Sequence, residues 1–153
     1  MRTYEHRFRK TINFLASFPG FFIPIGIFAY FIRDIRIITL FVLTLITVAT
    51  IQLLIKYLVP TQRPSGYHPD EIMLNTSIYS SFPSNHTSWS FILFLFVYGF
   101  LPHLTIWFWL FAISVALGRI YLKKHHPRDI LWSIIISLII YELAKTIFLY
   151  LSL

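Results

Sequence analysis

Long apolar runs alternate with short polar segments along this chain of 153 residues. About 20 apolar residues are needed for a helix to cross a hydrocarbon core about 30 Å thick. Aromatic side chains gather near the ends of the runs, as they do at membrane interfaces. The pattern predicts an all-α, polytopic membrane helical bundle of about five transmembrane helices, extending approximately over residues Thr11 to Ile32, Ile37 to Ile55, Trp89 to Leu101, Leu104 to Leu122 and Ile130 to Leu153.

Two of these runs depart from a plain spanning helix. The first contains Pro19, Gly20 and Pro24, which we expect to kink it or to split it into an interfacial piece and a shorter crossing. The third run reaches bilayer length only if its helix begins before Trp89, within the polar residues that precede it. Residues 1–10 are basic and interspersed with aromatics, with no small-residue cleavage site after them, so an N-terminal interfacial helix is expected rather than a signal peptide.

The composition excludes an ordinary soluble domain. Only 12% of the residues are charged and 57% are hydrophobic, whereas soluble domains average about 25% charged residues. The length favours one membrane domain over residues 1–153, and the absence of cysteine excludes disulfide and thiolate chemistry. Much of the net charge of +7 lies in the polar segments and the first ten residues, which favours anionic lipid or substrate over nucleic acid as the partner.

Three polar segments carry the residues with chemical potential: Lys56-x6-Arg63-Pro64, Pro83-Ser84-Asn85-His86 and Gly118-Arg119-x5-His125-x3-Asp129. They lie where the second run ends, the third begins, the fourth ends and the fifth begins. Successive crossings therefore place all three segments on the same face of the membrane. Ionisable groups kept in so apolar a chain indicate a functional site.

The third polar segment holds a histidine and a carboxylate one helical turn apart. Pro127 favours a helix start between them. Asp129 could then accept the Nδ1 proton of His125, which would leave Nε2 as a nucleophile. Arg119 could bind two phosphate oxygens. The alternative is a basic juxtamembrane loop that only contacts lipid headgroups.

The other two segments supply an anion site and cations. Ser84 and Asn85 are good N-cap residues, and the free N–H groups of a helix start attract anions. His86 would lie in the first turn, placed to protonate a leaving oxygen. Lys56 and Arg63 could clamp a phosphate. Taken separately, each segment has a simpler interpretation. The segment with Ser84 and Asn85 could be an ordinary helix cap, and Lys56 and Arg63 could be cations that snorkel to the membrane surface. Taken together, the segments complement one another.

In this order and spacing, the three motifs resemble the signature of the type-2 phosphatidic acid phosphatase superfamily, over residues 56–129. That superfamily includes membrane lipid phosphatases, undecaprenyl-diphosphate phosphatases, glucose-6-phosphatase and vanadium haloperoxidases. Two positions depart from the common pattern, Asn85 where glycine or aspartate is usual and Gly118 where serine is usual. Neither departure removes a catalytic group.

The resemblance implies a role for each residue. His125 would be the nucleophile that forms a phosphohistidine, Asp129 would orient it, and His86 would be the general acid and then the base. The phosphoryl oxygens would be bound by Lys56, Arg63, Ser84, Asn85 (through its N–H) and Arg119. No metal or cofactor is implied, and a zinc site of His86, His125, His126 and Asp129 fits no common zinc spacing.

The expected function is metal-independent hydrolysis of a phosphomonoester or pyrophosphate on a lipid. Two alternatives are a lipid phosphotransferase with the same site and a non-enzymatic anion-binding or transport bundle. Resemblance to small bacterial members places the site outside the cytoplasm, at the plasma membrane, whereas the basic N-terminus favours the opposite orientation. The sequence leaves open the lipid, the oligomeric state and the role of the loop at 65–82.

Overall fold

The computed structural model describes residues 7, 10–14, 18–65 and 80–151, and within these residues the chain is helical without a strand. Residues 10–14 are helical. The further elements are η1 (Phe18–Phe21), α2 (Phe22–Phe31), α3 (Ile35–Leu58), α5 (Asn85–Phe100), η3 (Pro102–Leu104), α6 (Thr105–Tyr121) and α7 (Pro127–Leu151). The prediction of an all-α chain is confirmed for this part of the molecule.

Local sequence signals account for the helix boundaries. Asp34 is the N-cap of α3, and its carboxylate accepts a hydrogen bond of 2.9 Å from the backbone N–H of Arg36. Pro127 opens α7, as its fixed φ favours at a first helical position. The first predicted run is interrupted where its prolines predicted a break, because Pro19 falls in the short η1 and the α-helix begins only at Phe22.

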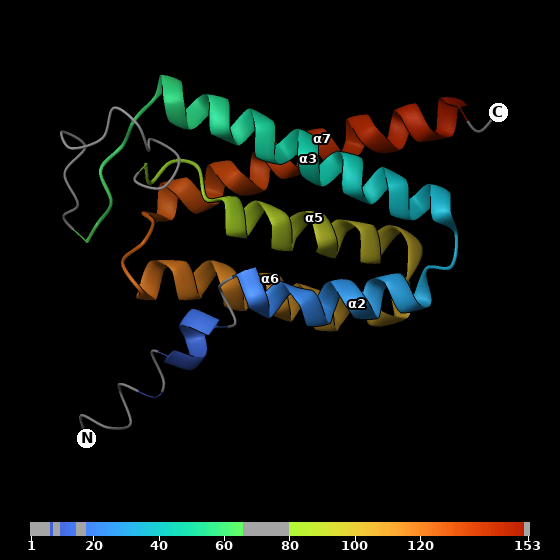
Figure 1. Cartoon of the computed structure of the whole chain (residues 1–153), viewed down its shortest axis with the longest axis horizontal. Helices are drawn as coiled ribbons and strands as arrows, with labels where there is room; N and C mark the ends of the chain where they lie inside the picture. The colour runs from blue at the N-terminus through green and yellow to red at the C-terminus, as the bar shows by residue number, and fades with distance from the viewer. Residues whose placement is uncertain (1–6, 8–9, 15–17, 66–79, 152–153) are drawn as a thin grey trace.

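Helix α5 occupies the centre of the bundle and packs against α3, α6 and α7 (Figure 1). Phenylalanine rings fill the space between the helices. Phe41 of α3 lies 4.9 Å from Phe28 of α2 and 5.2 Å from Phe96 of α5, measured between ring centroids. All three rings are buried. Tyr141 of α7 also contacts Phe96, with ring centroids 5.4 Å apart, so one aromatic core joins four helices.

Among the described residues, three helices are long and apolar enough to cross a membrane: Ile35–Leu58, Pro102–Tyr121 and Pro127–Tyr150. The prediction of about five spans is not confirmed. Helix α2 has 10 residues and α5 has 16. At 1.5 Å per residue these helices are about 15 and about 24 Å long, short of a hydrocarbon core of about 30 Å. The chain is a membrane protein with at least these three candidate spans.

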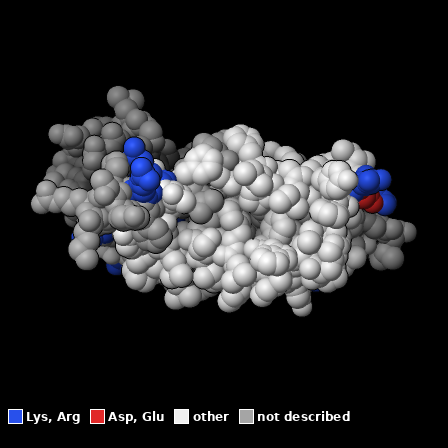
Figure 2. Space-filling model, turned by 90° about the horizontal axis from the view of Figure 1, so that it is seen from below, with Lys and Arg blue, Asp and Glu red and all other residues white. Residues whose placement is uncertain are grey.

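The four helix ends at which the sequence places the three polar segments lie together at one end of the bundle. Figure 1 shows the end of α3, the start of α5, the end of α6 and the start of α7 together, which confirms the predicted shared face. On the face seen in Figure 2, lysine and arginine lie near both ends of the molecule, and the described surface between them is uncharged. An uncharged middle of this kind suits a hydrocarbon environment.

Two expectations fall on residues without a described structure. Apart from Arg7 and Lys10, the expected interfacial segment at 1–10 lies outside the described residues, and so do residues 66–79 of the loop.

Candidate active site

The structure brings the predicted site residues to the same end of the bundle. Lys56 lies in the last turn of α3, Arg119 in the last turn of α6 and Asp129 in the first turn of α7. Ser84 is the N-cap of α5, Asn85 and His86 open that helix, Arg63 follows α3, and His125 lies in the connection from α6 to α7. Five of these side chains are buried, namely Lys56, Ser84, Arg119, His125 and Asp129.

The ring of His125 is held by a backbone carbonyl. Its Nδ1 lies 2.6 Å from the carbonyl oxygen of Ser81, which can only accept, so Nδ1 carries the proton and Nε2 is left without one. The sequence pattern predicted Asp129 as the acceptor of this proton. That expectation is wrong in this geometry, because the nearest oxygen of Asp129, Oδ2, is 3.9 Å from Nδ1. The carboxylate of Asp129 thus lies beside the ring of His125 as a negative charge and does not accept its hydrogen bond.

Asp129 is committed to other donors. Its Oδ2 accepts the Ser81 hydroxyl hydrogen bond and, at 2.8 Å, the backbone N–H of His126. His126 directly precedes α7, so the second contact is the half of a capping box in which an acidic residue of the first turn binds the N-cap N–H. Asp129 therefore fixes the start of α7 and the Ser81 segment at once, next to the His125 ring.

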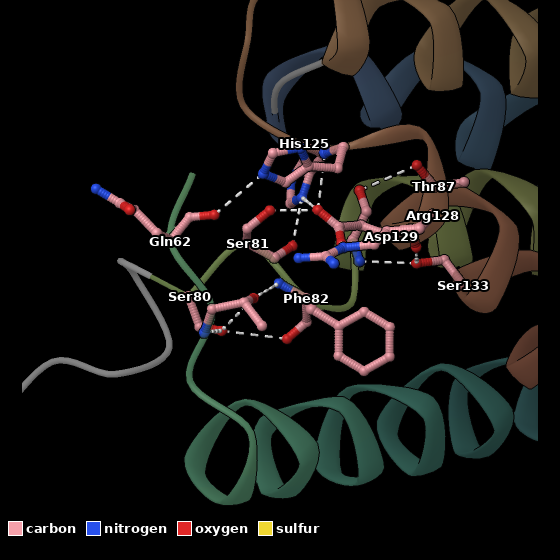
Figure 3. Close-up of polar contacts among 12 residues, drawn as sticks. Gln62, Ser80, Ser81, Phe82, Thr87, His125, Arg128, Asp129 and Ser133 are labelled. Carbon is pink, nitrogen blue, oxygen red and sulfur yellow. Dashed lines mark hydrogen bonds and ion pairs between the residues drawn. The ribbon is translucent and has the colours of Figure 1, made fainter. Parts of the chain in front are cut away.

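The segment from Ser80 to Phe82 forms a wall of the site that the sequence pattern did not single out (Figure 3). The ammonium of Lys56 donates to the carbonyl of Ser80 at 3.0 Å. Thr61 accepts from the backbone N–H of Ser81 at 2.9 Å and, with its hydroxyl, from that of Phe82 at 2.8 Å. Backbone groups make most of these bonds, and the only sequence signal for them was a serine pair shortly before the second polar segment.

The start of α5 is joined to α7 through the hydrogen bonds of Ser84. Ser84 has an extended backbone, and its side chain does not cap the helix. Instead, its hydroxyl accepts from the hydroxyl of Thr87 at 3.0 Å. The N–H of Ser84 donates to the hydroxyl of Ser133 at 2.7 Å, and that hydroxyl donates to the carbonyl of Asp129 at 2.6 Å. Ser133, on α7, was not predicted, yet it ties the start of α5 to the start of α7.

A buried polar network continues below this contact. The amide of Gln52 on α3 donates to the hydroxyl of Ser88 on α5, which in turn donates to the carbonyl of Ser133 at 3.1 Å. Ser137 donates to the same carbonyl at 2.7 Å. These hydrogen bonds join α3, α5 and α7 and fix their relative positions below the site. Breaking one would leave a buried polar group without a partner, which costs folding free energy.

The buried cations of the site favour an anion and keep His125 neutral. Burial lowers the pKa of Arg63. Burial, followed by the charges of Arg119 and Lys56, lowers the pKa of His125 to about 2, against the opposing effect of its bond to Ser81. The imidazole is therefore neutral at neutral pH, with Nε2 free of a proton.

The remaining features concern His86 and metal binding. The ring of His86 packs edge-on against Phe21, with ring centroids 6.1 Å apart. The amide oxygen of Asn85 is buried and has no hydrogen-bond partner among the described residues. In the same part of the chain, no three histidine, aspartate or glutamate side chains are grouped so as to hold a metal ion. The polar groups present thus converge on a cationic pocket beside a neutral imidazole.

Comparison with known proteins gives one family match. The sequence profile described as the PAP2 superfamily matches residues 37–152, a stretch that contains all three polar segments. No curated protein and no solved structure gives a significant match. The resemblance inferred from the motifs is thereby confirmed: the chain belongs to the PAP2 superfamily, whose members are generally phosphatases.

Proposed function

We propose that this protein is a membrane lipid phosphatase that hydrolyses a phosphomonoester or pyrophosphate of a lipid through a phosphohistidine intermediate. One observation carries the proposal. The bond of 2.6 Å from Nδ1 of His125 to the Ser81 carbonyl leaves Nε2 unprotonated, in a pocket whose cations are those a phosphate requires.

The first step transfers the phosphoryl group to the enzyme. Nε2 of His125 attacks phosphorus and the bond from phosphorus to the lipid oxygen breaks. Burial, followed by the charge of Arg119, lowers the pKa of His86 to about 3, so His86 must take up a proton together with the anionic substrate, and it donates that proton to the oxygen as it leaves. The imidazole ring gains positive charge in this step, and the buried carboxylate of Asp129, 3.9 Å from Nδ1, stabilises it.

The second step returns the enzyme to its starting state. His86 accepts a proton from water, whose oxygen attacks phosphorus, and the bond from phosphorus to Nε2 breaks. Inorganic phosphate is released. Lys56, Arg63 and Arg119 neutralise the phosphoryl oxygens in both steps, with the N–H groups at the start of α5. These fixed charges supply the stabilisation for which other phosphoryl-transfer enzymes use magnesium.

The position of the site supports a lipid substrate. It lies at the end of helices α3, α6 and α7, which are long and apolar enough to cross a membrane. A phosphate bound there is at the level of lipid headgroups, and the attached chain can remain in the hydrocarbon region.

The test is phosphate release by the purified protein from a panel of lipid phosphates and diphosphates. His125→Ala should abolish turnover. His103→Ala is the matched control, because His103 is exposed at the other end of the bundle, against Phe31. Activity should persist in EDTA and fall with vanadate, a phosphate analogue.

Each other outcome of this assay contradicts the proposal. Transfer of phosphate to a second lipid without release to water would identify a phosphotransferase. Binding of phosphate with no turnover on any substrate would identify an anion-binding protein. Undiminished turnover in His125→Ala would exclude the phosphohistidine.

We further propose that the site faces outward from the cell membrane. The chain has no cysteine, so a single substitution, His6→Cys, reports the side on which its N-terminus lies. Labelling of intact cells by a membrane-impermeant maleimide is expected. Labelling only after lysis would reverse the orientation.

A further inference from the structure

Thr61 lies in the connection that follows α3, and the mechanism above gives it no role. It is half-buried, and it precedes the phosphate-binding Arg63 in this connection. Its three polar groups bind three consecutive residues, Ser80 to Phe82. Its backbone N–H donates to the hydroxyl of Ser80 at 3.3 Å, and its carbonyl accepts from the N–H of Ser81 at 2.9 Å. Its hydroxyl accepts from the N–H of Phe82 at 2.8 Å.

The segment that Thr61 binds carries the group that orients the nucleophile. The carbonyl of Ser81 accepts from Nδ1 of His125 at 2.6 Å, and this bond decides which ring nitrogen is free to attack phosphorus. Ser81 is buried and lies beside the ring of His125 (Figure 3). Because the acceptor is a backbone carbonyl, the side chain of Ser81 does not set its direction. The bonds that fix the neighbouring backbone set it.

One of those bonds acts on the same peptide unit. The carbonyl of Ser81 and the N–H of Phe82 belong to one peptide bond, which is trans and planar, so the two groups point in opposite directions. The N–H end of this unit binds the hydroxyl of Thr61, and the carbonyl end binds His125. A rotation of the unit that breaks the first bond also turns the carbonyl away from the imidazole.

The rest of the segment is fixed by other groups. The ammonium of Lys56 donates to the carbonyl of Ser80 at 3.0 Å, and the hydroxyl of Ser80 donates to the carbonyl of Phe82 at 3.2 Å. The backbone of Thr61 makes its own bonds to Ser80 and Ser81 whatever its side chain is. Loss of the Thr61 hydroxyl therefore frees one peptide unit and leaves the segment in its place.

We propose that Thr61 is a positioning residue of the phosphatase, whose hydroxyl fixes the peptide unit between Ser81 and Phe82 and thereby holds His125 in the tautomer with a free Nε2. The inference rests on the proposed function and adds a residue to it. Three groups form one line of hydrogen bonds: the hydroxyl, the peptide unit and the imidazole. Hydrogen bonds in such a line polarise one another, so the first strengthens the second as well as directing it.

The kinetic experiment compares two variants that each keep part of the threonine side chain. Thr61→Val keeps the shape and loses the hydroxyl, and Thr61→Ser keeps the hydroxyl and loses the methyl group. Thr61→Val should lower kcat by about tenfold to a hundredfold, as expected for a slightly misplaced reacting group, with less than about a threefold change in inhibition by inorganic phosphate. Thr61→Ser should restore most of kcat. Thr50→Val is the matched control, because that hydroxyl is exposed and bonds within α3, to the carbonyl of Ile46.

The second readout reports the tautomer directly and needs no turnover. In ¹⁵N NMR spectra of histidine-labelled protein, the signals of His125 are identified by their loss in His125→Ala. Wild type and Thr61→Ser should carry the proton on Nδ1 alone. In Thr61→Val, part of the population should carry it on Nε2. Thr61→Ala also lacks the hydroxyl and should show the same two effects, so the test does not depend on how valine packs.

Four results are decisive. Wild-type kcat in Thr61→Val and Thr61→Ala would overturn the positioning role. A loss that Thr61→Ser fails to restore would assign the effect to the methyl group, and a loss with an unchanged tautomer would show that Thr61 does not act through Ser81. Turnover of no lipid phosphate by the wild type would end the proposed function, and the NMR spectra would still decide whether Thr61 sets the tautomer of His125.

Discussion

Replacing Asp129 with asparagine separates two roles that a carboxylate beside a nucleophilic histidine can have. Because the Ser81 carbonyl already accepts the Nδ1 proton, the substitution should leave the tautomer of His125 unchanged and remove only a charge. At 3.9 Å, and with an effective dielectric constant near 20, that charge stabilises a full imidazolium by about 4 kcal/mol. The ring is only partly charged in the transition state, so kcat should fall by about 10² to 10³.

The assay is phosphate release at saturating substrate, together with ¹⁵N NMR of histidine-labelled protein. Asp129→Asn should retain the Nδ1–H signal of His125. Ser81→Ala is the matched control, since it removes the hydroxyl that binds Asp129 and keeps the carbonyl that binds His125. A loss of about 10⁴ with a changed tautomer, as where a carboxylate sets the tautomer of a catalytic histidine, would refute this reasoning. A loss under threefold would show that the charge is irrelevant.

Three further predictions concern stability and titration. Ser133→Val leaves the buried N–H of Ser84 without its acceptor and should cost about 1–3 kcal/mol, seen as a lower thermal midpoint in detergent; an unchanged midpoint would contradict the network. His125 should stay neutral by NMR down to pH 4, and, since the unfolded chain takes up its proton below about pH 6.5, this group should make the fold less stable as the pH falls below that value; titration of folded His125 near 6.5 would contradict its burial. Gly99→Ala places a Cβ 2.5 Å from the Tyr141 hydroxyl and should destabilise by about 1–3 kcal/mol, with relief in a Tyr141→Phe background; equal losses in both backgrounds would exclude this clash.

Hydropathy predicted the long helices closely. The runs expected from Ile37 to Ile55 and from Leu104 to Leu122 correspond to α3 and α6, displaced by a few residues. Boundaries set by local chemistry, such as the start of α7 at Pro127, were also predictable. The lengths of α2 and α5 were not, because an apolar run can lie inside a bundle as readily as in lipid. The apolar part of the third run began at Trp89, and α5 begins at Asn85 with Ser84 as its N-cap, within the second polar segment where the cap residues predicted a helix start.

The residue types of the candidate site were predictable from the sequence, but many of the contacts between them were not. Charged and histidine side chains stand out in an apolar chain, and alternate crossings brought them to one end. Ser81 and Ser133 gave no comparable signal, because serine is common in loops and helices and its bonds here involve backbone groups. The contact between Lys124 and Asn13 joins residues 111 positions apart, which no local pattern can indicate.

The sequence by itself therefore determined a helical membrane protein, the candidate catalytic groups available to it and the end of the bundle at which they gather. These follow from hydropathy, which can be read from each segment by itself, and from the order of the crossings, which is obtained by counting segments along the chain. Only the tertiary structure decided that a backbone carbonyl, rather than Asp129, accepts the proton of His125. Every residue carries a carbonyl, so which one meets a given imidazole depends on how the helices pack, and packing is a property of the whole bundle.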